Sequence, residues 1–205
     1  MNKKEKFLKI FNAAKKHYEK DKKRLAAEGW EHNWQTLIAT IMSAQTRDET
    51  TIPVAENLYK KYTLKQLAKE DPQKIREVIR KINYNKNKSV YIVQTANILI
   101  KDYEGKVPQN MQDLLKLPGV GRKTANLILG ECFKKPAICV DTHVHRISNV
   151  FKIVQTKTPD ETEKELTKIA PKNTWIEINR YFVLWGKEVP GKNPQRLLNH
   201  INLTL

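Results

Sequence analysis

This 205-residue chain lacks long apolar runs and has few cysteines. No apolar stretch reaches the roughly 18 to 20 residues that a helix needs to span a bilayer, so we expect no membrane segment. The first residues, 1–6, are charged and lead into no apolar signal core, so export is not expected. Cys132 and Cys139 are too few for a disulfide framework, which favours a reducing, intracellular setting.

Acidic side chains are also in deficit. There are 38 Lys and Arg residues against 22 Asp and Glu residues, which gives a formal net charge of +16 and a sequence pI near 9.7. Such an excess suits a polyanionic partner, because each neutralised phosphate releases condensed counterions. A lysine-rich genome that places lysine on every solvated face would produce the same excess, so charge alone leaves both interpretations open.

Alternating β patterns and low-complexity linkers are scarce too. Apolar residues recur at helical spacing instead, as at Leu37, Ile38 and Ile41, and only 137–140 is predicted as a short extended run. The pattern therefore predicts a helical protein. The expected helices span residues 3–20, 34–44, 52–61, 63–69, 72–81, 86–102, 111–116, 122–132, 142–150, 159–169, 174–185 and 194–202.

Two proline pairs mark expected helix starts. Asp71-Pro72 and Thr158-Pro159 each place an N-cap residue before a proline at the first helical position. Glu161 follows Thr158 by three residues, which is the spacing of a capping box.

Residues 117–121, Leu-Pro-Gly-Val-Gly, predict a tight hairpin between two helices. Glycines at 119 and 121 would let the backbone approach a phosphate, and the free N–H groups and dipole of the next helix would bind it. Such a contact recognises the DNA backbone and not its sequence. An ordinary interhelical turn is the alternative, because Pro and Gly occur in many turns. The candidate DNA-binding residues here are Gly119, Val120, Gly121 and Arg122.

Three segments together resemble a known family. Residues 117–125 read Leu-Pro-Gly-Val-Gly-Arg-Lys-Thr-Ala, residues 140–146 read Val-Asp-Thr-His-Val-His-Arg, and residues 37–48 include Ser-Ala-Gln-Thr-Arg-Asp. They resemble, in the same order, the signatures of the endonuclease III family of DNA glycosylases. The resemblance implies an all-α, two-lobed helix-hairpin-helix DNA glycosylase fold. A six-helix barrel lobe would span residues 33–136, and residues 1–32 and 137–205 would build a second helical lobe.

Lys123 is the expected nucleophile. It lies in the first turn of the helix after the hairpin, where the helix dipole and the expected partial burial disfavour an ammonium and make a neutral amine more accessible. A neutral lysine amine forms Schiff bases. The resemblance implies that this lysine attacks the sugar C1′, expels the base and leads to β-elimination. The alternative is a lysine that only binds phosphate.

Asp141 is the expected catalytic carboxylate. The resemblance implies that it stabilises the oxocarbenium-like sugar or moves protons to and from the lysine. Its position before Thr-His-Val-His also suits a helix N-cap, and both roles are compatible.

Four further residues are expected to contact DNA. A damaged base must leave the duplex to be excised, and the resemblance places Gln45 in the gap that remains. Tyr84 stands where the family often has leucine, and its ring would act as a second wedge. His143 and Arg146 are similar to the family's residues and would support their helix or touch phosphate. His143 and His145 point to different helix faces, so no metal site is expected.

The four cysteines of most family members are absent. Their C-x6-C-x2-C-x5-C pattern binds a [4Fe–4S] cluster, and the aligned positions here are Val189, Arg196, Asn199 and Leu205. We therefore expect no cluster and no other cofactor. The tail would instead be held by packing of side chains such as Leu197, Leu198 and Ile201.

The expected function is that of a bifunctional DNA glycosylase and AP lyase in base excision repair. It would excise damaged bases, oxidised pyrimidines in particular, and cleave the strand by β-elimination through a lysine Schiff base. One alternative substrate class is uracil or thymine mismatches, alkylated bases or 8-oxoguanine. Another alternative is a non-catalytic helix-hairpin-helix DNA-binding module. The expected partner is double-stranded DNA with a damaged base or abasic site. The expected state is a monomer, cytoplasmic and nucleoid-associated, without membrane contact.

Overall fold

The computed structural model describes residues 1–204, and within these residues every regular element is a helix. This confirms the all-α class expected from the apolar spacing. Residues 137–140, predicted as extended, are a buried connector that belongs to no helix or strand. No helix among the described residues combines the length and hydropathy required to cross a membrane.

The chain divides into two compact units. One comprises Arg24–Lys134, and the other combines Met1–Lys23 with Lys135–Leu205. The segment 24–32 belongs to the first of these because its polar groups bond there. The Arg24 guanidinium pairs with Glu56 at 3.0 Å, and the Ala26 N–H donates to Asp48 at 3.0 Å.

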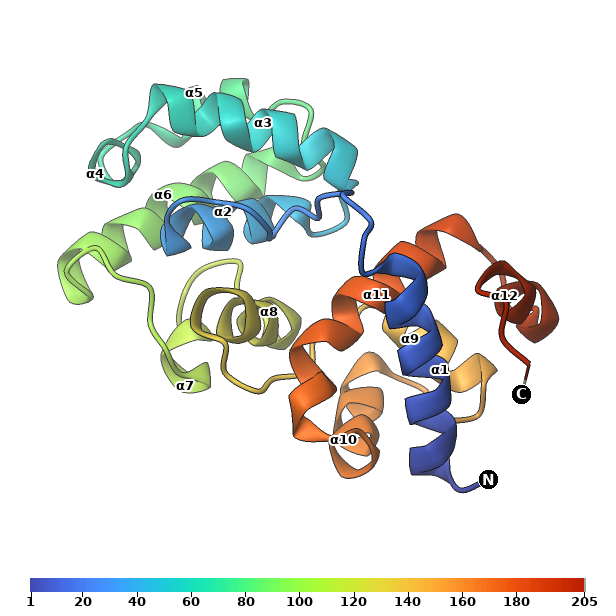
Figure 1. The fold of residues 1–205 in the computed structure, drawn as a ribbon. Helices are drawn as coiled ribbons and strands as arrows, with labels where there is room; N and C mark the ends of the chain where they lie inside the picture. The colour runs from blue at the N-terminus through green and yellow to red at the C-terminus, as the bar shows by residue number, and fades with distance from the viewer. Residues whose placement is uncertain (205) are drawn as a thin grey trace. The chain divides into compact units, whose positions relative to one another are not determined.

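The unit Arg24–Lys134 is arranged around α2 (Asn33–Ser43), which packs against α3, α6 and α8 (Figure 1). Seven consecutive residues of α2, 36–42, are buried, as expected of a helix that is apolar on most of its surface. The other helices of this unit are α3 (Asp48–Lys61), α4 (Leu64–Leu67), α5 (Pro72–Val78), α6 (Asn85–Asp102), α7 (Met111–Leu114) and α8 (Arg122–Phe133).

The second unit is arranged around α11 (Trp175–Glu188), which packs against α1 and α9 (Figure 1). Trp185 is fully buried and stacks on Phe151, while Lys15 and Glu177 form a 2.8 Å ion pair between α1 and α11. The N-terminal helix is therefore part of a core made mainly of C-terminal residues. The other elements are α1 (Lys3–Tyr18), α9 (Thr142–Val150), α10 (Pro159–Ile169), the 3-10 helix η1 (Lys172–Thr174) and α12 (Pro194–His200).

The predicted helix starts at residues 72 and 159 are confirmed. The Asp71 side chain accepts from the Gln73 N–H, and the Thr158 side chain accepts from the Glu161 N–H. The capping box is only half formed, because the Glu161 carboxylate accepts from the N–H of Lys157 instead of Thr158.

The predicted start of α3 at residue 52 is wrong by four residues. The helix begins at Asp48, and Asp48 and Glu49 occupy its first turn, where negative charge interacts favourably with the helix dipole. Pro53 consequently lies inside the helix and not near its start. The interior proline removes one backbone hydrogen bond, which obscured the true start in the sequence pattern.

Candidate nucleic-acid interface and catalytic residues

The predicted hairpin is present between α7 and α8. The Val120 N–H donates to the Leu117 carbonyl at 3.1 Å and closes the turn, and Gly121 is the N-cap of α8. No side chain caps this helix start. The first-turn N–H groups of an α-helix have no partner within the helix, so this end offers donors to an anion. Gly121, Arg122 and Lys123 are all exposed there.

The two hairpin glycines have different structural roles. Gly119 has φ +77°, and a Cβ there would lie 2.9 Å from Cδ2 of Tyr91 and 3.2 Å from Cγ2 of Ile41. Its conformation and close packing therefore require glycine. Gly121 has φ −94°, and a Cβ there would meet nothing within 4 Å. Gly121 therefore has an ordinary backbone angle, and its open surroundings leave phosphate approach as its candidate role.

Val120 was expected among the DNA-binding residues. Its side chain is buried and its N–H bonds the Leu117 carbonyl, so in this structure the valine packs inside the unit and closes the turn.

Lys123 lies in the first turn of α8, as predicted, but its side chain is exposed. The expected partial burial is therefore wrong.

Asp141 is the N-cap of α9. Its Oδ1 accepts from the backbone N–H groups of His143 and Val144, both at 2.9 Å. The cap thus uses one of the two carboxylate oxygens and fixes the direction of the other. Asp141 can therefore cap the helix and still offer an oxygen for catalysis. Asp141 belongs to the unit that includes Lys135–Leu205, whereas Lys123 belongs to Arg24–Lys134.

Gln45 and Tyr84, the two expected wedges, share an uncommon backbone conformation. Both are exposed, and both are left-handed, with φ of 55° and 57°. A non-glycine residue in this region costs energy and persists only where its surroundings hold it. Here the two loops bond to each other, because Asn83 donates its side-chain amide to the Gln45 carbonyl and its backbone N–H to Thr46 Oγ1.

Lys88, to which the sequence interpretation gave no role, bonds the backbone just before Gln45. Its side chain is buried, and Nζ donates to the Met42 carbonyl at 2.7 Å and the Ala44 carbonyl at 2.5 Å. These carbonyls lie at the end of α2, where the helix leaves them without intrahelical donors. Burial lowers the pKa of Lys88 to about 8.

A sequence signal for Lys88 existed. It falls on the buried face of α6 with Ile92, Ala96 and Leu99, at helical spacing. A lysine on an apolar helix face is uncommon unless its ammonium has partners.

Of the two roles expected for Arg146, helix support or phosphate contact, the structure shows contacts of the supporting kind. Its guanidinium donates to the carbonyls of Gly186 at 2.9 Å and Val189 at 3.1 Å, and also to the Gly191 carbonyl. These groups end α11, so Arg146 satisfies carbonyls that the helix leaves open. Burial lowers the pKa of Arg146, and the nearby Asp141 charge opposes that shift.

The His143 side chain, like that of Arg146, packs against α11 of its own unit. A Cβ at Gly186 would lie 2.4 Å from the His143 Nδ1, so the imidazole lies directly over the α11 backbone. This arrangement agrees with the interpretation of His143 as a residue that supports its helix.

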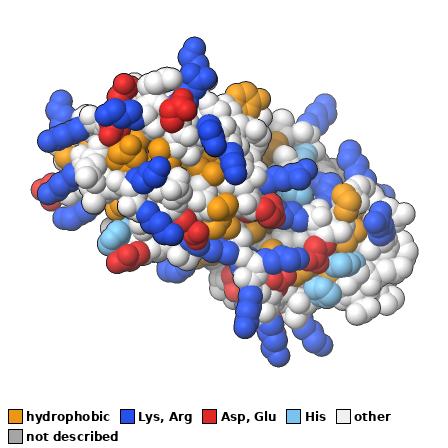
Figure 2. Space-filling model, turned by 90° about the horizontal axis from the view of Figure 1, so that it is seen from above, with side chains coloured by type: hydrophobic (Ala, Val, Ile, Leu, Met, Phe, Trp, Pro, Cys, Tyr) orange, Lys and Arg blue, Asp and Glu red, His pale blue; other side chains and the backbone are white. Residues whose placement is uncertain are grey.

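Basic side chains are distributed widely over the surface. Figure 2 shows Lys and Arg side chains spread over the visible face, with fewer acidic side chains among them. This distribution agrees with the net charge of +16. It provides nonspecific attraction to a polyanion, while the hairpin provides a defined anion position.

Comparison with known proteins gives concordant matches. The model of the HhH-GPD superfamily of base excision DNA repair proteins matches residues 38–172. The chain is 45% identical to endonuclease III of Thermotoga maritima over 157 residues, which cover 76% of this chain and 74% of the relative. It is 35% identical to endonuclease III of Bacillus subtilis over 75% of this chain and 71% of the relative. A solved endonuclease III, trapped as a covalent intermediate with DNA, matches with a TM-score of 0.85 and 32% identity, over 95% of this chain and 92% of that one.

These relatives overturn the expectation of a cofactor-free protein. Endonuclease III homologues and structures are typically [4Fe–4S] cluster proteins, so the prediction of no cluster conflicts with them and is corrected. The sequence holds only Cys132 and Cys139, which lie in different units and do not make up a four-thiolate set by themselves. Of the positions aligned with the usual ligands, Val189 is buried, Arg196 and Asn199 are exposed, and Leu205 lies outside the described residues.

Proposed function

Because this chain belongs to the endonuclease III family of base excision DNA repair enzymes, it is a DNA glycosylase and AP lyase, and we propose that Lys123 and Asp141 perform its chemistry. The family confirms three expectations from the sequence: the activity, the damaged-DNA partner and the helix-hairpin-helix glycosylase fold. The catalytic residues, the lesion class and the cellular site of action are proposals.

One observation carries the assignment of Lys123. Its amine is exposed in the first turn of α8, next to a helix start that no side chain caps. A DNA phosphate bound at that start would hold the strand within reach of the same turn. The hairpin thus provides a phosphate anchor and a nucleophile on consecutive residues.

The proposed reaction has two stages. The Lys123 amine attacks C1′ of the damaged nucleoside, and the N–C1′ bond forms as the glycosidic bond breaks. The base leaves with the bonding electrons and takes up a proton. Opening of the sugar gives a Schiff base, after which loss of the C2′ proton expels the 3′ phosphate by β-elimination.

Asp141 is the proposed proton acceptor and electrostatic stabiliser. A carboxylate can act as a general base for an amine nucleophile. The cap on α9 orients this carboxylate through two backbone N–H groups. A fixed negative charge also stabilises the positive character of the sugar as the base leaves.

Gln45 and Tyr84 are the proposed wedges for the gap that a flipped nucleotide leaves. Both project from exposed left-handed positions on loops that bond to each other. We expect Gln45→Ala to slow release of a damaged base from duplex DNA more than it slows cleavage of a preformed abasic site, which has no base to flip. Equal slowing of both steps would count against the wedge role.

The proposed substrates are oxidised pyrimidines, by analogy with the endonuclease III relatives. The proposed place of action is inside the cell at the nucleoid, where the damaged DNA lies. A panel of duplexes, each with one lesion, tests the substrate class. Excision of a mismatched, alkylated or 8-oxoguanine base in preference to oxidised pyrimidines would replace it.

Borohydride trapping on abasic duplex DNA tests the nucleophile. We expect the wild-type protein to form a covalent adduct, and Lys123→Gln to form none while it still binds the DNA. Lys65→Gln removes the same charge from another exposed position in the same unit and is the matched control. Wild-type trapping by the Lys123 variant would rule out the Schiff-base assignment.

A further inference from the structure

Three metal-ligating side chains meet at the ends of three helices in the unit that does not contain the hairpin. His17 lies in the last turn of α1, Glu188 ends α11 and His200 ends α12. One ligand atom from each lies within 4.8 Å of the other two. All three belong to the same compact unit. This grouping is tertiary, because residues near 17, 188 and 200 are far apart along the chain.

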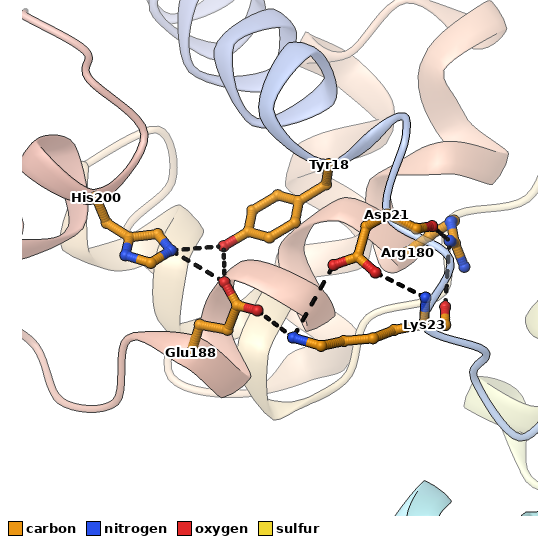
Figure 3. A network of polar contacts seen from close by, with 6 residues as sticks. All are labelled: Tyr18, Asp21, Lys23, Arg180, Glu188 and His200. Carbon is orange, nitrogen blue, oxygen red and sulfur yellow. Dashed lines mark hydrogen bonds and ion pairs between the residues drawn. The ribbon is translucent and has the colours of Figure 1, made fainter.

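The Glu188 carboxylate is the centre of the group (Figure 3). Lys23 Nζ donates to Oε1, while the Tyr18 hydroxyl donates to Oε2 at 2.9 Å. His200 Nε2 lies 3.0 Å from the same Oε2.

The two imidazoles lie close to each other. The ring centroids of His17 and His200 are 5.2 Å apart, and Tyr18 lies beside both rings. His17 and Glu188 are exposed and His200 is half-buried. A small ion from solvent therefore has access to the group.

We propose that His17, Glu188 and His200 bind a divalent transition-metal ion of the zinc type. Two neutral imidazoles and one carboxylate are a ligand set that zinc uses in proteins, with water in the fourth position. Metal–ligand bonds are about 2.0–2.2 Å long, so ligand atoms around one ion lie within about 4 Å of one another. The Glu188 and His200 atoms already meet this requirement at 3.0 Å, and His17 is exposed on the neighbouring helix.

Lys23 fits this site as an outer partner. Lys23 bonds Oε1 of Glu188 and orients the carboxylate. The other oxygen, Oε2, is thereby directed at the His200 imidazole. Ligating carboxylates are commonly held by such a second hydrogen bond. The bound ion would connect α12 to both α1 and α11, and so fasten the C-terminal helix to the body of its unit.

Zinc titration of the full-length protein tests the proposal. The protein must carry no polyhistidine tag and must first be freed of metal with a chelator. We expect calorimetry to show one zinc ion per chain. Zinc at 100 times the Kd should raise the Tm by about 5–10 °C.

Three variants separate this site from other histidines. His17→Ala and His200→Ala should each weaken zinc binding at least tenfold, whereas His32→Ala, an exposed histidine in the other unit, should not change it. His17→Ala is the more decisive variant, because His200 also bonds Tyr18 and Glu188, and circular dichroism checks that both variants fold. Absence of zinc binding by the wild type, or unchanged binding by the His17 and His200 variants, would overturn the proposal.

Discussion

Replacing Gly121 by valine tests whether the start of α8 binds DNA phosphate. Gly121 has φ −94°, which valine adopts without strain, and a Cβ there meets no protein atom within 4 Å. The variant should therefore fold as the wild type does. Its side chain would instead occupy the space through which a phosphate reaches the N–H groups of the helix.

The expected loss follows from the bonds at this helix start. At about 2 kcal/mol for each hydrogen bond to a charged group, losing one or two such bonds costs about 2–4 kcal/mol. This corresponds to a Kd that is roughly 30 to 900 times weaker. Because the contact is to phosphate, undamaged and damaged duplexes should lose affinity equally.

Gly119→Ala is the matched opposite in the same hairpin. Its Cβ would lie 2.9 Å from Tyr91 and 3.2 Å from Ile41, in a left-handed conformation. The conformation costs about 1–2 kcal/mol and overpacking about 1–3 kcal/mol, so this variant should lose about 2–5 kcal/mol of unfolding free energy.

Binding isotherms on both duplexes and denaturant unfolding of both variants provide the assay. The reasoning requires Gly121→Val to lose affinity without losing stability, and Gly119→Ala to lose stability. If folded Gly121→Val bound both duplexes as tightly as the wild type, the hairpin would be only a turn and the phosphate site would lie elsewhere.

Three further predictions concern stability and reactivity. Lys88→Met should lower the unfolding free energy by about 1–3 kcal/mol, because carbonyls at the end of α2 lose their donor. Lys101→Met, on the exposed face of α6, is the control and should leave the unfolding free energy unchanged. The folded pKa of Lys88, about 8, lies below the unfolded value of about 10.4, so wild-type stability relative to Lys88→Met should rise with pH between those values in denaturant titrations. Arg146→Gln should lower the Tm but leave the DNA affinity of the folded protein unchanged, and a large loss of affinity alone would instead favour its DNA-contact role. Burial raises the pKa of the Cys132 thiol to about 11, and Cys139 is only 3% exposed. Both thiols should therefore react slowly with a disulfide reagent at pH 8 until the protein unfolds. Fast reaction of either thiol in the native protein would contradict this prediction.

Local sequence determined the helices and the hairpin. The spacing of apolar residues, the caps at Asp71 and Thr158 and the glycine pattern at 117–121 act over a few residues, so they can be recognised without the fold. The family signatures were equally local, and the comparisons confirmed the family that they indicated. The catalytic pair remains a prediction that rests on those signatures.

Tertiary packing decided what individual residues do. Gly119 and Gly121 look alike in the sequence, but only the structure shows that Tyr91 and Ile41 crowd one of them and that the other is open. Arg146 lies in a DNA-binding signature, yet its guanidinium bonds the end of α11, whose carbonyls are some 40 residues away in sequence.

The group of His17, Glu188 and His200 shows the same limit most clearly. No sequence pattern connects these residues, because they come from three different helices. Tyr18, the neighbour of His17, is already 182 positions from His200. The sequence by itself determined that helices would form and that one hairpin would be suited to DNA. Which side chains bond, crowd or face solvent depended on how the helices pack, because a side chain's partners are set by distance in space and not by distance along the chain.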